Sequence, residues 1–360
     1  MREFKKRILF LYLPLLIICI ISLFNLYNLN YRRLFMKQII CYIIIIFIIV
    51  LFQKININKL FKLSWPIYII NIFLLILVLF WGNETNGAKA WLKIGMFSFQ
   101  PSEFMKLSLS LLLASISSKL SLKTYKDEFI LICKFFLIMI IPSILVFLEP
   151  DTGAIIFYII ITLTILFLIL KHKSWFIIFG LIMIAFLGGF IYLYNFKRDL
   201  LINVMGTSIF YRIDRIINFK KNIGYQLNNA LVVIGSAKLF YLHKHNILYI
   251  PEASTDFAFA YTIGNLGLIF GFIILIIYLF IIIYLLNLYD NLKNKKIKLF
   301  LISFINLFVF NIIYNIGMNL GLLPIMGIPL PFLSYGGSTM LIYALYLGIL
   351  IKEYNRSINI

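Results

Sequence analysis

The chain has 360 residues, of which 63% are hydrophobic and only 13% are charged, and its mean hydropathy is +1.02. A soluble domain carries nearer ~25% charged residues, so the composition excludes a soluble globular protein and indicates lipid as the main solvent. The formal net charge of +20 does not indicate nucleic-acid binding. The basic residues lie in short clusters between apolar runs, where they set membrane topology and meet anionic headgroups.

Apolar runs follow one another along almost the whole chain. A helix needs about 20 apolar residues to cross the hydrocarbon core of a bilayer. The first run follows a basic N-terminus but has no small-residue cleavage site, so it is expected to remain as a span. We predict an all-α integral membrane protein, a single polytopic domain over residues 1–360. Ten transmembrane helices are expected near 8–28, 38–53, 65–81, 103–118, 129–148, 152–170, 175–195, 256–287, 299–319 and 332–351.

The distribution of charge predicts the orientation. With both termini in the cytoplasm, eighteen Lys and Arg residues lie in short cytoplasmic segments and five in short outer loops, as the positive-inside rule requires. The segment 196–255, between spans seven and eight, is a long extracytoplasmic loop to which the rule does not apply. Most carboxylates fall on the outer side in this topology, so chemistry that needs them is expected there: Glu84, Glu103, Glu149, Asp151, Asp199, Asp214, Glu252 and Asp256.

The region 313–338 is rich in Gly and Pro. The whole stretch 299–351 contains no Asp, Glu, Lys or Arg, although a solvated loop would carry charge. Irregular backbone at membrane depth is tolerated only where protein or a cavity satisfies its polar groups. We therefore expect a re-entrant segment that lines a groove open to lipid.

Three carboxylates share one structural position, the outer N-terminus of a predicted helix. They are Glu103 in QPSEF, Asp151 in EPDTG and Asp256 in STDF. Helix capping is the plain explanation for each one alone, because such side chains accept hydrogen bonds from free N–H groups and favour the positive dipole end. Their occurrence at one depth also fits a site at the outer face, and both interpretations remain open.

Two sets of basic residues lie near these carboxylates. Lys106 is three residues after Glu103 and shares its helix face. It forms either a structural ion pair or a cation held where a lipid diphosphate would lie. The outer segment 203–228 alternates apolar and basic residues, including Arg212 and Arg215. An interfacial amphipathic helix that contacts anionic headgroups is expected there.

Several motifs occur in an order typical of one bacterial family. They are NGAKAWLKIGMFSFQPSEFMKLSL, EPDTGA, GYQLNNALVVIGS, PEASTDFAFA and NIGMNLGLLPIMGIPLPFLSYGGS. Across about 80–350 the chain resembles the shape, elongation, division and sporulation (SEDS) family. The last motif is similar to the elongation branch (RodA) more than to the division branch (FtsW). Three stretches depart from the family pattern: Ala90 before Trp91, Gly264-Asn265 after the STDF motif, and GSAKLFYLHK at 235–244.

The resemblance implies a peptidoglycan glycosyltransferase of the bacterial cytoplasmic membrane, active in cell elongation. Such an enzyme polymerises lipid II outside the membrane and works with a class B penicillin-binding protein, a transpeptidase. Matched residue by residue, the family's essential Asp corresponds to Asp256. Its substrate-binding residues correspond to Glu103, Lys106, Asp151 and Ser334.

The chemistry of this reaction assigns roles to the candidates. The acceptor sugar hydroxyl needs a general base, and the departing diphosphate needs positive charge. Asp256 is the expected base, and partial burial would raise its pKa. Lys106, Arg212, Arg215 or a divalent cation (Mg²⁺ or Mn²⁺) would neutralise the diphosphate. A lipid II flippase is the main alternative, but transporters usually place charge near the midplane on repeated halves. A non-catalytic scaffold for the transpeptidase is the second alternative.

Overall fold

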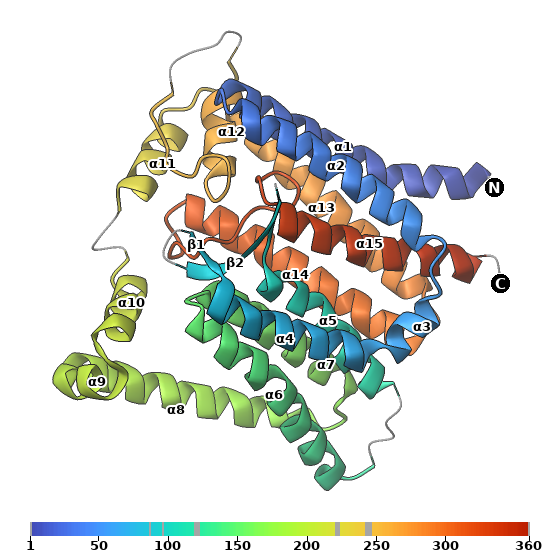
Figure 1. The fold of residues 1–360 in the computed structure, drawn as a ribbon, viewed down its shortest axis with the longest axis vertical. Helices are drawn as coiled ribbons and strands as arrows, with labels where there is room; N and C mark the ends of the chain where they lie inside the picture. The colour runs from blue at the N-terminus through green and yellow to red at the C-terminus, as the bar shows by residue number, and fades with distance from the viewer. Residues whose placement is uncertain are drawn as a thin grey trace.

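The computed structural model describes residues 2–85, 88–95, 97–118, 123–219, 224–241 and 247–358, and helices dominate it (Figure 1). A first group of helices comprises α1 (Arg2–Asn28), α2 (Arg32–Phe52), α3 (Ile57–Lys62), α4 (Ser64–Trp81), α5 (Pro101–Ser117), α6 (Tyr125–Leu148), α7 (Thr152–Ile169) and α8 (Ser174–Phe196). The remaining helices are α9 (Arg198–Met205), α10 (Thr207–Ile217), α11 (Tyr225–Gly235), α12 (Ala258–Leu266), α13 (Leu268–Asn291), α14 (Lys295–Asn319) and α15 (Gly337–Ile358).

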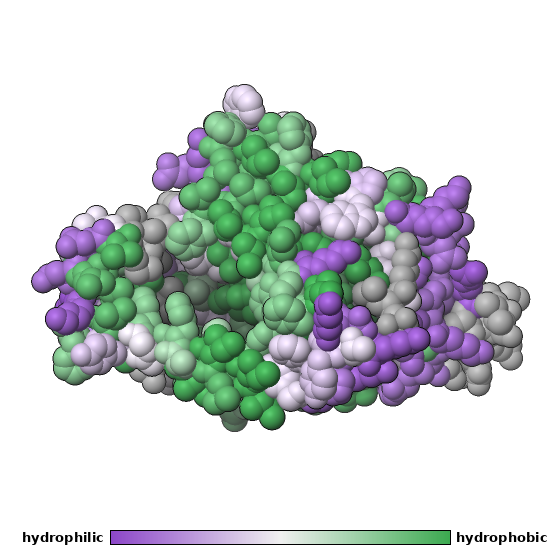
Figure 2. Space-filling view, turned by 90° about the horizontal axis from the view of Figure 1, so that it is seen from below, coloured by the Kyte–Doolittle hydropathy of each residue, from purple (hydrophilic) through white to green (hydrophobic). Residues whose placement is uncertain are grey.

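The predicted membrane architecture is confirmed. Within the described chain, α2, α4, α6, α7, α8, α13 and α14 are each long and apolar enough to cross a bilayer. The other expected spans coincide with α1, whose apolar part is Tyr12–Asn28, with the 17-residue α5, and with α15. Figure 2 shows apolar side chains across the middle of one face and hydrophilic ones gathered toward its ends. This banding is expected of a protein that spans a bilayer.

The predicted eighth span is interrupted, which corrects the expectation of one helix over 256–287. It consists of the short α12 and the long α13, and Gly267 separates them with φ +104. A methyl group on the Cα of Gly267 would lie 2.4 Å from the Cα of Phe240, so only glycine fits. The N–H groups of Leu268 and Ile269 donate to the carbonyls of Lys238 and Leu239. The altered 235–244 loop therefore supplies acceptors to the start of α13.

The irregular segment near the C-terminus is shorter than predicted. Helix α14 continues to Asn319, and non-helical backbone occupies only 320–336 before α15 begins at Gly337. The predicted last span accordingly starts five residues later than 332. Within the segment Ile328, Leu330 and Phe332 are buried, so the protein itself covers much of this backbone. The expectation that it lines a lipid-accessible groove stays a prediction.

A small antiparallel sheet, absent from the sequence-based prediction, lies between the C-terminal end of α4 and the N-terminal end of α5. It consists of β1 (Asn83–Thr85), β2 (Ala88–Ile94) and β3 (Phe97–Phe99) in the order β1-β2-β3. The Cα pairs Asn83–Trp91 and Leu92–Phe99 set its register. Ala90, the residue that departs from the family pattern, is buried on β2 with 1% of its surface exposed.

Helix α5 lies at the centre of the bundle. Almost all its residues are buried, and it packs against α4, α7, α14 and α15. The N-terminal pair α1–α2 is fixed to the second half of the chain by polar contacts. Asn25 donates to the hydroxyl of Thr262 at 2.7 Å, and Asn28 donates to the side-chain oxygen of Asn265 at 3.0 Å. The departure at 265 therefore provides a structural contact to α1.

Helix α8 diverges from the bundle. Its first turns pack by aromatic contacts, such as Phe176 on Phe167 and Phe179 on Phe136, but Tyr194 is the only buried residue of this helix. Figure 1 shows α8 extending away from the other spans toward α9 and α10. The predicted amphipathic helix over 203–228 is instead interrupted at Gly206, which has φ +81, and α10 ends at Ile217.

Candidate active site

Asp151 is held by the start of α5 and caps α7. Its Oδ2 accepts hydrogen bonds from Gln100 Nε2 at 2.9 Å and Ser102 Oγ at 2.8 Å. Its Oδ1 accepts from the backbone N–H of Ala154 at 3.4 Å. The capping explanation is therefore correct for Asp151. Tyr158 strengthens the junction by donating to the carbonyl of Ser102 at 2.8 Å.

Glu103 and Lys106 form a buried ion pair on the first turns of α5. Lys106 Nζ lies 2.5 Å from Glu103 Oε1, and the two residues are only 5% and 7% exposed. The ammonium group also lies 3.9 Å from the centre of the Phe157 ring. A buried charge is stable only when it is paired and hydrogen-bonded. The structure thus shows the structural ion pair that the sequence allowed, while contact of Lys106 with a diphosphate stays a prediction.

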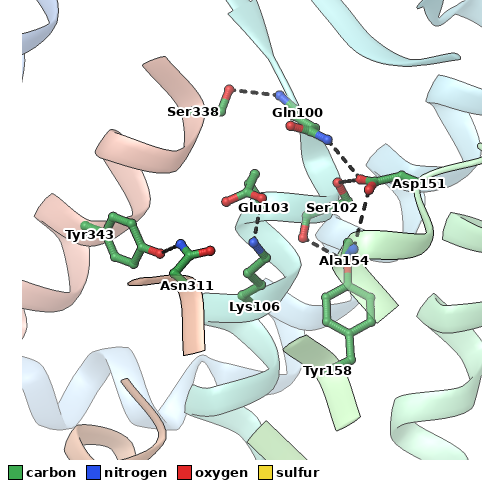
Figure 3. Close-up of polar contacts among 10 residues, drawn as sticks. All are labelled: Gln100, Ser102, Glu103, Lys106, Asp151, Ala154, Tyr158, Asn311, Ser338 and Tyr343. Atoms are coloured by element: carbon green, nitrogen blue, oxygen red, sulfur yellow. Dashed lines mark hydrogen bonds and ion pairs between the residues drawn. The ribbon is translucent and has the colours of Figure 1, made fainter. Parts of the chain in front are cut away.

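The two α5 clusters face in different directions (Figure 3). Ser102 points toward Asp151 and α7, whereas Glu103 and Lys106 point toward the side of α5 that faces Asn311 and Tyr343. Asn311 donates to the Tyr343 hydroxyl, but its Oδ1 is buried without a hydrogen-bond partner. A polar strip therefore continues from α5 across to α14 and α15.

Asp256 lies in the turn before α12, and its backbone is clamped. Asn315 and Asn319, one turn apart on α14, each donate a side-chain N–H to the Asp256 carbonyl at 3.0 Å. Asn315 also donates to the Ile328 carbonyl at 2.7 Å, and Asn319 accepts from the N–H of Ala260 at 3.1 Å. One pair of amides thus fixes both the Asp256 turn and the 320–336 segment.

The Asp256 carboxylate itself is left available. In the described part of the chain it makes no hydrogen bond or ion pair, and the residue is partly buried. Burial, reinforced by the nearby Glu252 carboxylate, raises its pKa from 3.8 to about 7. The predicted direction of the shift is confirmed. A carboxylate with this pKa is half ionised near neutral pH, as a general base requires.

The 320–336 segment connects the two carboxylate-bearing turns. A methyl group on Gly327 would lie 3.8 Å from Oδ2 of Asp256, and one on Gly153 would lie 3.1 Å from the carbonyl oxygen of Met326. Met326 and Gly327 are consecutive residues, so this non-helical segment contacts both the start of α7 and the Asp256 turn. Asp151 and Asp256, far apart in sequence, therefore border the same segment.

Ser334 has a supporting position. It is 1% exposed, donates to the Thr255 carbonyl at 2.5 Å and accepts from the N–H of Leu330 at 2.9 Å. Its hydroxyl is therefore committed to holding the residue next to Asp256. Contact between Ser334 and substrate stays a prediction.

The predicted arginines lie on α10, at some distance along the chain from these clusters. The backbone of Arg212 and Arg215 is helical, but their side chains lie outside the described residues. Within the described chain, neither of the other two carboxylates caps its helix by a hydrogen bond to a free N–H group, although Glu103 lies in the first turn of α5. Glu103 pairs with Lys106, and the residue at the start of α12, Phe257, has no side-chain cap from Asp256.

Sequence reasoning missed Glu149. It is fully buried, and neither carboxylate oxygen has a hydrogen-bond partner. Burial, together with the neighbouring Asp151, raises its pKa from 4.5 to about 8. In the sequence, only its position in the EPDTG motif could have pointed to Glu149 as a residue of this region. Asn315 and Asn319 were also missed, although two Asn residues one turn apart in an apolar helix are a detectable signal.

Within the described ranges, no group of three or more His, Cys, Asp or Glu residues is arranged to hold a metal ion. The Glu252 carboxylate nevertheless lies close enough to Asp256 for its charge to raise the pKa of Asp256. Mg²⁺ is commonly bound by one or two carboxylates together with substrate phosphates. The pair therefore fits a cation that arrives with a diphosphate.

Comparison with known proteins identifies the family. The model of the FtsW/RodA/SpoVE cell cycle proteins matches residues 4–357. The chain belongs to this family. An FtsW of Wigglesworthia glossinidia brevipalpis, described as a probable peptidoglycan glycosyltransferase, is 33% identical over 79% of this chain and 74% of its own length. One from Buchnera aphidicola subsp. Schizaphis graminum with the same description is 33% identical over 88% and 90%.

Solved structures share the fold of this FtsW/RodA/SpoVE chain. A chain from a peptidoglycan synthase complex that coordinates polymerization and crosslinking superposes with a TM-score of 0.81, at 24% identity, over 96% of this chain and 97% of its own. RodA of Thermus thermophilus superposes with a TM-score of 0.70, at 24% identity, over 96% and 95%. The curated relatives carry the division name and the Thermus structure the elongation name, so the resemblance to RodA within the family stays a prediction.

Proposed function

We propose that this chain polymerises lipid II into glycan strands at the outer face of the bacterial cytoplasmic membrane, with Asp256 as the general base. The activity is that of a peptidoglycan glycosyltransferase, which the descriptions of its curated relatives carry. The proposed orientation places both termini in the cytoplasm. Figure 1 shows both termini at the end of the bundle opposite α11, α12 and the small sheet, which agrees with an outer site.

One observation carries the assignment of the base. Two asparagines fix the backbone of Asp256, while no described residue engages its carboxylate. Asp151, by contrast, is bonded to Gln100 and Ser102. The unbonded Glu149 is fully buried, out of reach of a substrate. A general base instead needs a fixed position, free oxygens and a pKa near the working pH. Asp256 has all three.

The proposed mechanism is an inverting displacement. The ionised Asp256 accepts the proton of the acceptor sugar 4-hydroxyl as the oxygen attacks the anomeric carbon of the lipid-linked strand. The bond from that carbon to the diphosphate breaks as the new glycosidic bond forms. Positive charge is needed at the departing diphosphate, and Lys106, Arg212 and Arg215 are the proposed candidates. A divalent cation, which Glu252 and Asp256 would hold, would be an alternative source of that charge.

The proposed partner is a transpeptidase that crosslinks the product, namely a class B penicillin-binding protein. The support is the fold shared with a chain of a complex that coordinates polymerization and crosslinking. The proposed role in cell elongation rests on the similarity of the C-terminal motif to that of the elongation branch, RodA.

The test is polymerisation of purified lipid II by the full chain and by Asp256→Asn, with the transpeptidase present. Asp256→Asn keeps the size of the side chain but removes the base, so we expect at least a hundredfold loss of rate. The wild-type rate should rise about tenfold between pH 6 and pH 8, because ionisation of a group with a pKa of about 7 increases over that range. Full activity of a folded Asp256→Asn variant would refute the assignment. Lipid II movement across liposomes without polymerisation would support the flippase alternative.

A further inference from the structure

A second site lies at the opposite end of the bundle. A cavity of about 340 Å³ opens between α3, α4, α5 and α6, lined by Lys62, Ser64, Trp65, Ser115 and Lys134 together with apolar groups. Figure 1 shows α3 on the side where both termini lie. A water molecule occupies about 30 Å³ in the liquid. The cavity therefore has room for a phosphate group with part of a glycerol.

Two lysines from separate helices converge on this cavity. Lys62 ends α3, and Lys134 lies nine residues inside α6, about 14 Å along the helix from its first residue. Both side chains are exposed, and neither makes a hydrogen bond or ion pair with any residue of the described ranges. An unpaired ammonium group at this depth is costly unless it reaches water or an anion.

The two carboxylates in the first turn of α6 form hydrogen bonds with other residues. Asp127 belongs to the capping box of α6, whose N-cap is Thr124, and accepts from the N–H groups of Lys123 and Thr124. Glu128 accepts from the N–H of Lys171 and from Trp175 Nε1. Among the described residues that line the cavity, none is acidic. The lysine charges therefore face the cavity without a protein counter-ion.

The remaining lining matches a lipid headgroup. The hydroxyl of Ser115 donates to the Phe61 carbonyl at 3.1 Å, which joins α3 to α5 and shapes the cavity wall. Ser64 is buried at the start of α4, where the first N–H groups of a helix favour an anion. Trp65 is 43% exposed, as a tryptophan at a membrane interface commonly is.

We propose that this cavity binds the phosphate headgroup of an anionic phospholipid from the cytoplasmic leaflet, with Lys62 and Lys134 as its charge partners. A lipid is favoured over a free phosphate, because Lys134 lies inside a helix long and apolar enough to span the membrane and the exposed Trp65 lines the same cavity. Basic cavities between membrane helices on this side commonly take anionic headgroups. The site is separate from Asp256. It rests on the proposed function only through the proposed orientation, which makes this end of the bundle the cytoplasmic one.

The experiment titrates the purified full chain in neutral-detergent micelles with brominated phosphatidylglycerol and measures quenching of tryptophan fluorescence. The difference between wild type and Trp65→Phe isolates the signal from the cavity. Lys62→Gln combined with Lys134→Gln should weaken the binding roughly 25-fold, the product of about fivefold for each lysine. The matched control combines Lys59→Gln and Lys126→Gln, which remove the same charge from α3 and α6 outside the cavity lining. It should weaken binding less than threefold.

Three outcomes would overturn the proposal. Equal loss in both double variants would show only general attraction between charged surfaces. Equal quenching by brominated phosphatidylcholine would remove the requirement for an anion. Competition by millimolar inorganic phosphate as effective as that by the lipid would make soluble phosphate the occupant. Melting temperature confirms the folding of each variant, and Asp256→Asn should bind the lipid normally, so failure of this site is distinguishable from failure of the proposed catalysis.

Discussion

Glu149 makes the stability of this protein depend on pH in a predictable direction. Its carboxyl is fully buried without a hydrogen-bond partner, and its pKa is raised from 4.5 to about 8. Below pH 4.5 the group is protonated in both the folded and the unfolded chain, so its burial does not lower the free energy of unfolding through ionisation. As the pH rises toward 8, only the unfolded chain ionises it. The free energy of unfolding therefore falls by about 1.4 kcal/mol per pH unit.

The variant Glu149→Gln removes this titration while keeping the shape of the side chain. Over the two pH units from 5.5 to 7.5, the free energy of unfolding of the variant should gain about 3 kcal/mol relative to wild type. Reversible unfolding by SDS in mixed micelles, followed by tryptophan fluorescence, measures this difference at each pH. The pH-independent difference in free energy of unfolding between the two proteins is less informative, because the amide in the Glu149→Gln variant also buries polar groups.

A matched control is Glu84→Gln, because Glu84 is an exposed carboxylate on β1. Its unfolding free energy should follow that of wild type within about 0.5 kcal/mol over the same range. A constant difference between Glu149→Gln and wild type from pH 5.5 to 7.5 would refute the reasoning. It would show that Glu149 is ionised in the folded protein and reaches a partner or water.

Three further predictions concern the backbone break, the clamp and the buried ion pair. Gly267→Ala should destabilise the protein by more than about 2 kcal/mol, because its φ of +104 and the contact with Phe240 exclude a methyl group. Gly188→Ala on exposed α8, which has nothing within 4 Å, should instead stabilise it slightly, and both follow from the same unfolding assay. Asn319→Ala should lower the polymerisation rate more than tenfold while the protein remains folded, because the Asp256 carbonyl loses a donor; an unchanged rate would contradict the clamp. Glu103→Gln should cost about 3–5 kcal/mol of stability, because it leaves the buried Lys106 charge without its counter-ion; a thermal melt equal to wild type would contradict burial of that charge.

The membrane spans could be predicted because hydrophobic length is a local property of the sequence. The helix starts at Asp151 and before α12 were found for the same reason, since acidic residues and small polar groups mark such positions. The break at Gly267 could not be found in this way. A single glycine in an apolar run is compatible with a helix, and its φ of +104 depends on contact with Phe240, a residue that arrives from another part of the fold.

The charged residues of the candidate site could be predicted from the sequence, but the residues that hold them in place could not. Glu103, Lys106, Asp151 and Asp256 stand out because ionisable residues are rare in this chain. The capping role of Asp151 and the free carboxylate of Asp256 are indistinguishable in sequence, since both residues precede a helix. Only the tertiary contacts, namely Gln100 on Asp151 and the α14 asparagines on the Asp256 carbonyl, separate the two roles.

The bond between Asn25 and Thr262 has a consequence for the synthesis of the protein. The two residues are 237 positions apart, and ribosomes add about 5–20 residues per second. Helix α1 therefore waits about 12–50 s in the membrane before α12 exists. During that interval Asn25 must be satisfied by water near the interface or by an insertion factor. The first pair of helices reaches its final position only when the chain is nearly three-quarters made, so truncated nascent chains should leave α1 accessible to crosslinking agents.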